Sequence, residues 1–303
     1  NGSKIFDPKV DATTPVLPST FDGSLVIAAT RISDSSHANI LASVIEMQPT
    51  GRRASAYEAL AAGANQQFVP TAMCNYGTTR QTTYFSVQNT GTENATTFIE
   101  FYNSSGKLLA RTSVAATRSN KLQPNRRAAY STCTLSTMSR RSGSAMIYAT
   151  SNGKYTGPRV PVAVTTKVTS TDGLQTQSTP VQGATSLILP YVRWADADGY
   201  RSPIFVMNAG STSDNSVVLR YYDASGTLVA TQNLASATKV LAKKGFRTST
   251  PSQAGATSGG RFTGSVVIES TQPVVVIVRT VRPVTGVSGY KTLGEDYNGI
   301  PLP

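Results

Sequence analysis

The stretch Tyr221-Tyr-Asp-Ala-Ser-Gly-Thr-Leu-Val229 decides the fold, because the chain carries the same pattern about 120 residues earlier, as Phe101-Tyr-Asn-Ser-Ser-Gly-Lys-Leu-Leu109. In each stretch an aromatic pair precedes an Asn/Asp-x-x-Gly turn, and an apolar pair follows it. The glycine that ends the turn readily adopts the left-handed conformation that a bulged hairpin needs. The sequence therefore predicts the same β-hairpin twice.

Other short motifs recur at the same interval of about 120 residues. They are Asn89-Thr-Gly91 with Asn208-Ala-Gly210, the Gly-Ser steps at Gly23, Gly143 and Gly264, and Tyr57 with Tyr297, two intervals apart. A fixed interval indicates an array of similar structural units. We expect a partial first module over residues 1–66, which contains only the last strands behind an extended N-terminal segment. A complete module over 67–186 and a third over 187–303, which includes a C-terminal segment, follow it.

Apolar and polar residues alternate with a period of two through both full copies, as in half-buried strands. The alternation predicts strands at 83–88, 97–102, 107–111, 144–148 and 160–164, then at 216–222, 227–231, 265–269 and 273–278, and in the first copy at 24–28 and 40–45. A full copy holds about seven strands and no helix, which is the pattern of an immunoglobulin-like sandwich. We therefore expect an all-β protein of tandem immunoglobulin-like β-sandwich modules, the first one incomplete.

The order of these motifs resembles the tandem immunoglobulin-like repeats of bacterial secreted and cell-surface proteins, of the kind that form filaments or surface layers. The third copy carries the resemblance best, with Asn208-Ala-Gly210, Tyr222-Asp-Ala-Ser-Gly226, Phe262-Thr-Gly-Ser265, Ser270-Thr-Gln-Pro273 and Tyr297-Asn-Gly299. The second copy departs from it, since Arg141 stands where the third has Phe262. These motifs are structural, so the resemblance implies an extracellular scaffold and no chemistry.

Composition favours an exported protein. No apolar run approaches the roughly 20 residues that span a bilayer. The sequence starts without Met, as a mature chain does after removal of a signal peptide or as a fragment does, and we expect export. The chain has two cysteines, Cys74 and Cys133. A single pair in a secreted chain predicts one disulfide, and the alternative is two buried thiols.

The net charge of +12 predicts an anionic partner, either an acidic glycan or extracellular DNA. Basic pairs stand at Arg52-Arg53, Arg126-Arg127, Arg140-Arg141 and Lys243-Lys244. The alternative is that these residues solubilise exposed sheet faces and protect edge strands. Three Asn-x-Ser/Thr sites occur, at Asn1, Asn94 and Asn103, and the last two flank predicted turns where a glycan would be tolerated.

The sequence offers little for catalysis. One histidine, His37, and no Gly-x-Ser-x-Gly motif argue against a hydrolase triad. Asp196-Ala-Asp198-Gly199 resembles the start of a calcium loop, but calcium takes six to eight oxygens, and the alternative is a polar turn. We predict a protein that is not an enzyme and holds no cofactor.

The incomplete first copy predicts self-assembly. A sandwich without its front strands leaves apolar faces and strand edges open, and the segment Asn298-Gly299-Ile300-Pro301-Leu302-Pro303 aligns with the lead-in to a new first strand. We predict that copies of the chain join head to tail by strand complementation, as a homopolymer at the cell surface. The alternatives are a basic adhesin-like binding module and a fragment of a longer repeat protein.

Overall fold

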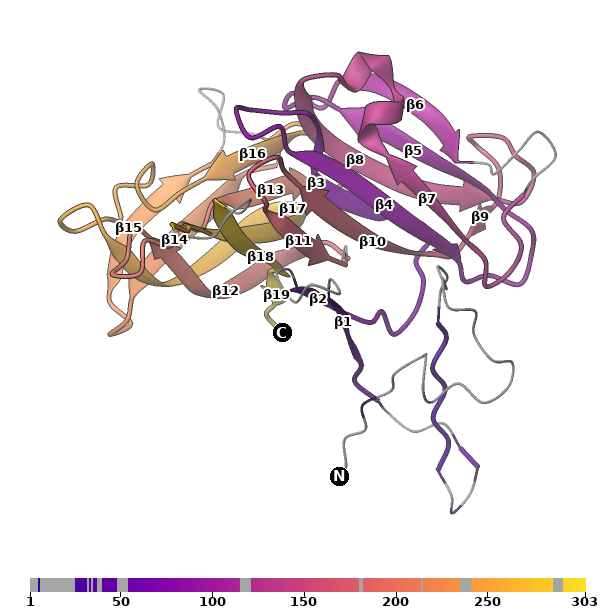
Figure 1. Cartoon of the computed structure of the whole chain (residues 1–303), viewed down its shortest axis with the longest axis horizontal. Coiled ribbons are helices and arrows are strands. Elements are labelled where there is room, and N and C mark those ends of the chain that lie inside the picture. Colours follow the sequence, from indigo (N-terminus) through magenta and orange to yellow (C-terminus); the bar gives the residue numbers. More distant parts are fainter. Residues whose placement is uncertain are drawn as a thin grey trace.

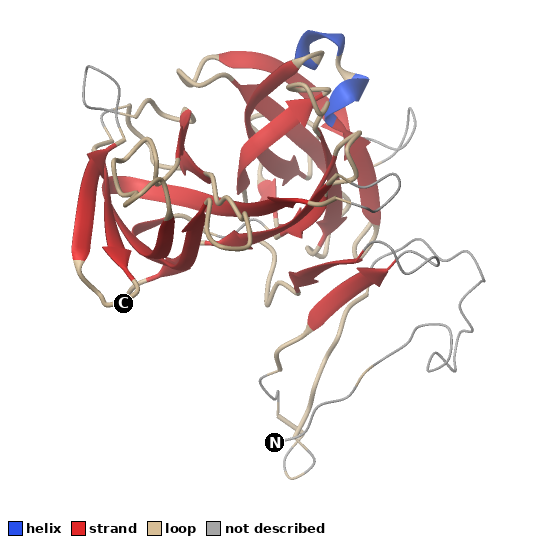
Figure 2. Cartoon of the chain, turned by 60° about the vertical axis from the view of Figure 1, so that its left-hand side comes forward, coloured by secondary structure: helices blue, strands red, loops and turns tan. Residues whose placement is uncertain are grey.

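The computed structural model describes residues 5, 25–31, 33, 35–36, 40–47, 54–114, 121–179, 182–213, 215–234, 241–285 and 291–303. Within these residues the chain is built of antiparallel strands with two short 3-10 helices and no α-helix, which confirms the all-β prediction (Figures 1 and 2). The strands are β1 Ser43–Met47, β2 Ala54–Glu58, β3 Gln67–Cys74, β4 Thr82–Asn89, β5 Thr96–Tyr102, β6 Leu108–Val114, β7 Arg127–Ser131, β8 Arg141–Thr150, β9 Arg159–Val160, β10 Val162–Thr169, β11 Gln175–Ser178, β12 Ala184–Trp194, β13 Ile204–Asn208, β14 Val217–Asp223, β15 Leu228–Asn233, β16 Phe246–Ser249, β17 Phe262–Pro283, β18 Thr292–Asn298 and β19 Ile300–Pro301; the helices are η1 Thr132–Thr134 and η2 Ser136–Met138.

Strands β3 to β11 form a middle lobe of two packed sheets. One sheet has the order β3-β8-β5-β6, with β9 paired to β8, and the other has the order β11-β10-β4-β7. Alternate residues of β10 are buried, as the period-two pattern predicts. The buried side chains of both sheets meet in one core that includes Phe85, Phe101, Ile147 and Val164.

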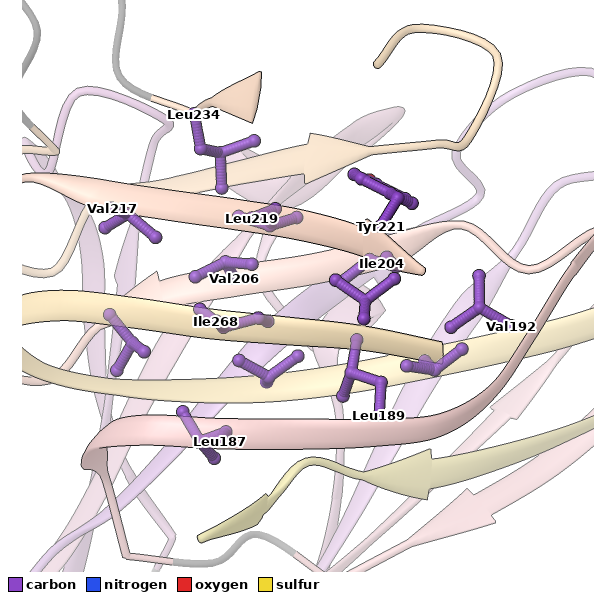
Figure 3. Close-up of a cluster of buried hydrophobic side chains, with 14 of the residues drawn as sticks. Leu187, Leu189, Val192, Ile204, Val206, Val217, Leu219, Tyr221, Leu234 and Ile268 are labelled. Atoms are coloured by element: carbon purple, nitrogen blue, oxygen red, sulfur yellow. The ribbon is translucent and has the colours of Figure 1, made fainter. Parts of the chain in front are cut away.

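Strands β12 to β19 form a C-terminal lobe with the same pairing order. Here β12-β17-β14-β15 and β18-β17-β13-β16 are the two series of neighbours, and the short β19 adds to the free edge of β12. Figure 3 shows side chains from facing strands of this lobe, among them Leu189, Val206, Leu219 and Ile268, meeting in a single core. The two lobes therefore share one topology.

The two lobes differ at β17. The sequence predicts two strands at 265–269 and 273–278, but the structure joins them into one strand, Phe262–Pro283, which passes from one sheet to the other. In the middle lobe the corresponding strands β8 and β10 are separated by a longer connection that includes the turn residue Gly153 at φ 73°. In the C-terminal lobe only residues 270–272 separate the two predicted strands. So short a link has no room for a turn like the one at Gly153, and the backbone stays extended through it.

The two repeated hairpin turns adopt the same structure. The side-chain oxygens of Asn103 and Asp223 accept hydrogen bonds from the backbone N–H groups two and four residues later, at 2.9–3.0 Å. Gly106 and Gly226 both have positive φ, 77° and 83°. A register shift lies within the aromatic pair of both hairpins, between Phe101 and Tyr102 and between Tyr221 and Tyr222, as the bulged-hairpin prediction requires.

The two lobes pack against each other along a second apolar cluster, the seam. The outer face of the β3-β8-β5 sheet contributes aromatic side chains and a methionine. The outer face of β13 and β17 contributes Met207 and Val275. Its buried members are Phe68, Phe98, Tyr102, Met146, Tyr148, Met207 and Val275. Figure 1 shows the lobes side by side, the middle lobe in purple and magenta and the C-terminal lobe in orange and yellow.

Polar contacts fix the seam in register. The Ser144 hydroxyl donates to the carbonyl of Lys244 at 2.7 Å, and Arg247 donates to the carbonyl of Ser104 at 2.8 Å. Arg279, 2% exposed, forms two bonds of 2.8 and 2.9 Å with Asp296 in its own lobe. Its remaining terminal nitrogen donates to Gln81 of the middle lobe at 3.2 Å.

The N-terminal residues differ from the prediction. The expected strand at 24–28 is wrong for the described residues 25–28, which pair with no other strand in the part of the chain that is described. The second expected strand, at 40–45, is shifted to β1, which pairs with β2 in an isolated antiparallel hairpin. A strand needs a partner for its backbone hydrogen-bonding groups. Of the two predicted N-terminal strands, only the one that became β1 has such a partner among the described residues.

Each lobe begins at the start of a strand. The middle lobe begins at Gln67, and β12 of the C-terminal lobe begins at Ala184, shortly before the expected boundary at residue 186. The middle lobe contains more strands than the expected seven, because β3, β7 and β11 lack clear alternation in the sequence. The division of the chain into immunoglobulin-like modules stays a prediction.

The structure joins Cys74 and Cys133 in a disulfide that ties the end of β3 to η1. The two cysteines are 59 residues apart in the sequence. In the chain-entropy model, the bridge lowers the entropy of the unfolded chain and so raises the free energy of unfolding by about 4 kcal/mol. We expect a C74S/C133S variant, or the reduced protein, to melt at a clearly lower temperature in scanning calorimetry. An unchanged melting temperature with two titratable thiols in the untreated protein would contradict the bridge.

The seam can be tested at two matched glycines. A Cβ at Gly106 would lie 2.0 Å from the carbonyl oxygen of Lys243 across the seam, whereas a Cβ at Gly226 would meet nothing within 4 Å. Gly226→Ala should cost about 1 kcal/mol, from positive φ alone, and Gly106→Ala should cost about 1–3 kcal/mol more. Equal losses in denaturant unfolding would show that the seam does not constrain the turn.

Candidate functional site

The N-terminal arm, described at residues 25–31, 40–47 and 54–58, exposes strand-forming apolar side chains. Val26 and Ile45 are each 65% exposed, Met47 is 70% exposed, and Leu41 has no contact that shields it from solvent. In the C-terminal lobe, Val276 and Ile268 are fully buried. Figure 2 shows the β1–β2 hairpin outside the two lobes. An apolar, strand-like surface left in water is typical of an interaction site or an aggregation hazard.

One face of the β1–β2 hairpin lies on the middle lobe. Gln175 of β11 donates to the Ser55 hydroxyl at 3.0 Å. Glu46 accepts from Gln177 of β11 and forms an ion pair with Lys167 of β10. Because successive side chains of a strand alternate between faces, this polar face holds the arm in place and leaves the other face of β1 open.

The open face of β1 carries Ser43, Ile45 and Met47, and all three are exposed. Their cross-strand partners in β2 include two alanines, Ala54 and Ala56, which are also exposed. The hairpin therefore has one polar face that is bound and one apolar face that no described residue of the chain covers.

The predicted contact segment Asn298–Pro303 packs on its own lobe. Ile300 is the pairing partner of Ile188, and the N–H of Leu302 donates to the carbonyl of Ser186 at 3.0 Å. The N–H of Gly299 donates to the carbonyl of Val276 at 3.1 Å. Within a single chain the segment thus closes the edge of β12, and its exchange with another subunit stays a prediction.

The structure does not gather the predicted basic pairs into one patch. Arg52 and Arg53 lie outside the described residues. Arg127 pairs with Gln88 at one end of β4, and Arg141 pairs with Cys74 near the other end of that strand. Arg126 and Arg140, their neighbours in sequence, are both exposed.

A basic hollow does occur at the seam, lined by Lys107, Lys243 and Lys244 with Tyr102 and Met146. The Nζ of Lys244 lies 4.0 Å from the ring centroid of Phe68. Burial lowers the pKa of Lys244 to about 8, and the positive charge of Lys243 adds to the effect. The Lys243-Lys244 pair was visible in the sequence, but Lys107 joins it only through the packing of the two lobes.

The other predicted positions behave as structural residues. Asp196 accepts from the N–H of Tyr200 at 2.8 Å and lies 3.5 Å from Arg193, while Asp198 is exposed in the same turn. No group of three or more potential metal-ligating side chains occurs among the described residues. Asn94 is exposed and Asn103 is half-buried in its turn.

His37 lies outside the described part of the chain, so the structure says nothing of its partners. Within the described residues there is no helix with the length and hydrophobicity needed to cross a membrane.

No model of a protein family matches the chain, and no curated protein matches it. Among solved structures, the partial N-terminal region of an enterococcal surface protein is 6% identical, with a TM-score of 0.22, over 80% of this chain and 96% of that one. A glycosyl hydrolase family 2 member from Bacteroides cellulosilyticus is 9% identical, with a TM-score of 0.20, over 78% of this chain and 28% of that one. A β-glucuronidase from Bifidobacterium dentium is 11% identical, with a TM-score of 0.17, over 78% of this chain and 38% of that one. Similarities at these TM-scores carry no information on function.

Lys244 gives a pH-dependent test of the hollow. Its pKa is about 8 in the folded protein, against an ordinary value of 10.5, so the unfolded chain binds more protons between these values and stability rises with pH across that window. We expect Lys244→Met to raise the melting temperature at pH 7, since it removes a desolvated charge. The difference from the wild type should shrink between about pH 8 and 10.5. Lys243→Met, at the exposed neighbour whose charge adds to this shift, is the comparison variant and should raise the melting temperature less than Lys244→Met does.

Proposed function

We propose that this chain is a non-catalytic extracellular structural protein that assembles head to tail into a filament or layer at the cell surface. The observation that carries the proposal is the apolar arm, whose strand-forming side chains stay in water while those that form the cores of the lobes are buried. The disulfide supports an oxidising, extracellular setting. In the described lobes, polar side chains such as Asp196 take part in turns and ion pairs, which fits a structural role.

Strand complementation fits the arm best. The described arm holds one hairpin and one unpaired apolar run at Leu25, Val26 and Ile27. Such a run gains backbone hydrogen bonds and apolar burial together when a strand from another subunit pairs with it. The C-terminal segment is a suitable donor, because it is extended and presents Ile300 and Leu302 at a sheet edge.

A second candidate function rests on the basic hollow at the seam. Lys107, Lys243 and Lys244 converge there from both lobes, and a cluster of ammonium groups attracts sulfated or carboxylated glycans and nucleic acid phosphates. Such binding would weaken steeply with added salt. Assembly through apolar strands would persist, so salt distinguishes the two functions.

The test is the size of the purified chain as a function of concentration. We expect fibres or sheets by negative-stain electron microscopy, stable in 1 M NaCl because apolar burial is not screened by salt. A chain that ends at Tyr297 should remain folded and lose these polymers, since it lacks the donor segment.

Polymers formed by this truncated chain would remove the C-terminal segment from the assembly. A full-length chain that stays monomeric at every concentration, and binds an acidic glycan in low salt, would favour the second function. Circular dichroism of the truncated chain is the control for its fold.

A further inference from the structure

The seam shows how one lobe receives another. The receiving face is the outer face of β3, β8 and β5, where Phe68, Met146 and Tyr148 lie buried. The inserted row lies on β17, whose alternate residues Val275 and Ile277 are fully buried. Repetition of this arrangement along an array needs a second receiving face and a second inserted row.

The C-terminal lobe repeats the receiving face in the same register. Arg220 pairs with Val267 as Glu100 pairs with Met146, and Ile188 pairs with Val267 as Phe68 pairs with Met146. The outer face of β12, β14 and β17, which we call the open face, thus corresponds position by position to the face that forms the seam. Its members are Ile188, Val218, Arg220, Tyr222, Val267 and Glu269.

The open face is solvated where its counterpart is covered. In the seam the side chain of Glu100 is 6% exposed. In the open face, Arg220 and its ion-pair partner Glu269 have side chains that are 32% and 53% exposed. Val267, the pairing partner of Arg220, and Val218, the pairing partner of Glu269, are half-buried. No described residue of the chain packs over this face as the C-terminal lobe packs over the middle lobe.

The arm repeats the inserted row. Val44 pairs with Tyr57 in the hairpin as Val278 pairs with Tyr297 in the C-terminal lobe. Ile45 therefore stands where the lobe has Arg279. Ser43, Ile45 and Met47 thus correspond to Ile277, Arg279 and Val281. Leu41 lies two residues before β1 and continues this row towards the position of Val275, and we call Leu41, Ser43, Ile45 and Met47 the arm row.

The middle lobe does not repeat this row. Its corresponding residues on β10 are Ala163, Thr165, Lys167 and Thr169, of which only the first is apolar. The arm is the other described part of the chain with an apolar row at this position, and its row is exposed.

We propose that the open face of the C-terminal lobe binds the arm row of a second copy of the chain, in the arrangement by which the C-terminal lobe sits on the middle lobe. The inference rests on the proposed function and names its contact surface. The arm of the same chain is held on β10 and β11 of the middle lobe, so the contact joins two chains. A contact between two different surfaces propagates into a filament unless it closes.

The open face also borders the C-terminal segment. Ile188 of the open face is the pairing partner of Ile300 in β19. An arm docked there would lie next to the segment that complements it, so face docking and strand exchange act at one junction.

The experiment uses two full-length variants, each with one defective surface. Val267→Asp places a charge on the open face, and Ile45→Asp places one on the arm row. Analytical ultracentrifugation should find each variant monomeric, because every junction needs both surfaces. An equimolar mixture should give one-to-one dimers and nothing larger, since Val267→Asp supplies an intact arm and Ile45→Asp an intact face. Thr165→Asp, on the corresponding polar row of the middle lobe, is the matched control and should assemble as the wild type does.

Other outcomes separate the surface from the function. If Val267→Asp does not fold by circular dichroism, Val218→Asp on β14 replaces it in every arm of the test. Wild-type assembly by the face variant would overturn the open face and leave self-assembly standing. Monomers in the mixture would overturn the pairing of these two surfaces. A wild-type chain that is monomeric at every concentration would overturn the proposed function, and the inference with it.

Discussion

The seam is the interaction on which the rest of the structure depends. Phe68 and Tyr148 of one lobe and Met207 and Val275 of the other are removed from water by strands whose opposite faces already line a core. All eight residues of β3 are buried for this reason. Each lobe therefore covers apolar side chains of the other, and the two lobes pack against each other through a shared apolar cluster.

A buried polar network of the middle lobe lies at the seam. The hydroxyls of Tyr102 and Tyr148 donate to the carboxylate of Glu100, which also pairs with Arg111 at 2.6 Å. Burial raises the pKa of both tyrosines, and their hydrogen bonds to Glu100 add to this, so both remain donors at neutral pH. A buried charge is costly unless each of its oxygens has a partner. All of these partners come from β5, β6 and β8 of the middle lobe, and the seam keeps water away from them.

The two lobes share a topology but present different outer faces, and this difference gives the chain a direction. The middle lobe has an aromatic receiving face and a polar row on β10, whereas the C-terminal lobe has an apolar row on β17 and a partly charged open face. Within the chain, the receiving face and the row on β17 pack against each other. The exposed arm row comes from the N-terminal arm and the open face from the C-terminal lobe, and the proposed head-to-tail assembly would bring these two surfaces together between chains.

The all-β class, the two matching hairpins and the cysteine pair could be predicted from the sequence alone, because they depend on local rules: alternation with period two, a left-handed glycine after Asn103 or Asp223, and the presence of just two cysteines. It missed β3 and β11, whose residues are buried on both faces and so lose the alternation. Only the tertiary structure decided that Lys107 meets Lys243, that β17 runs through both sheets, and that the arm leaves Ile45 in water. Such features arise from contacts between residues that are distant in sequence, and the pattern along a single strand does not encode which second surface will cover it.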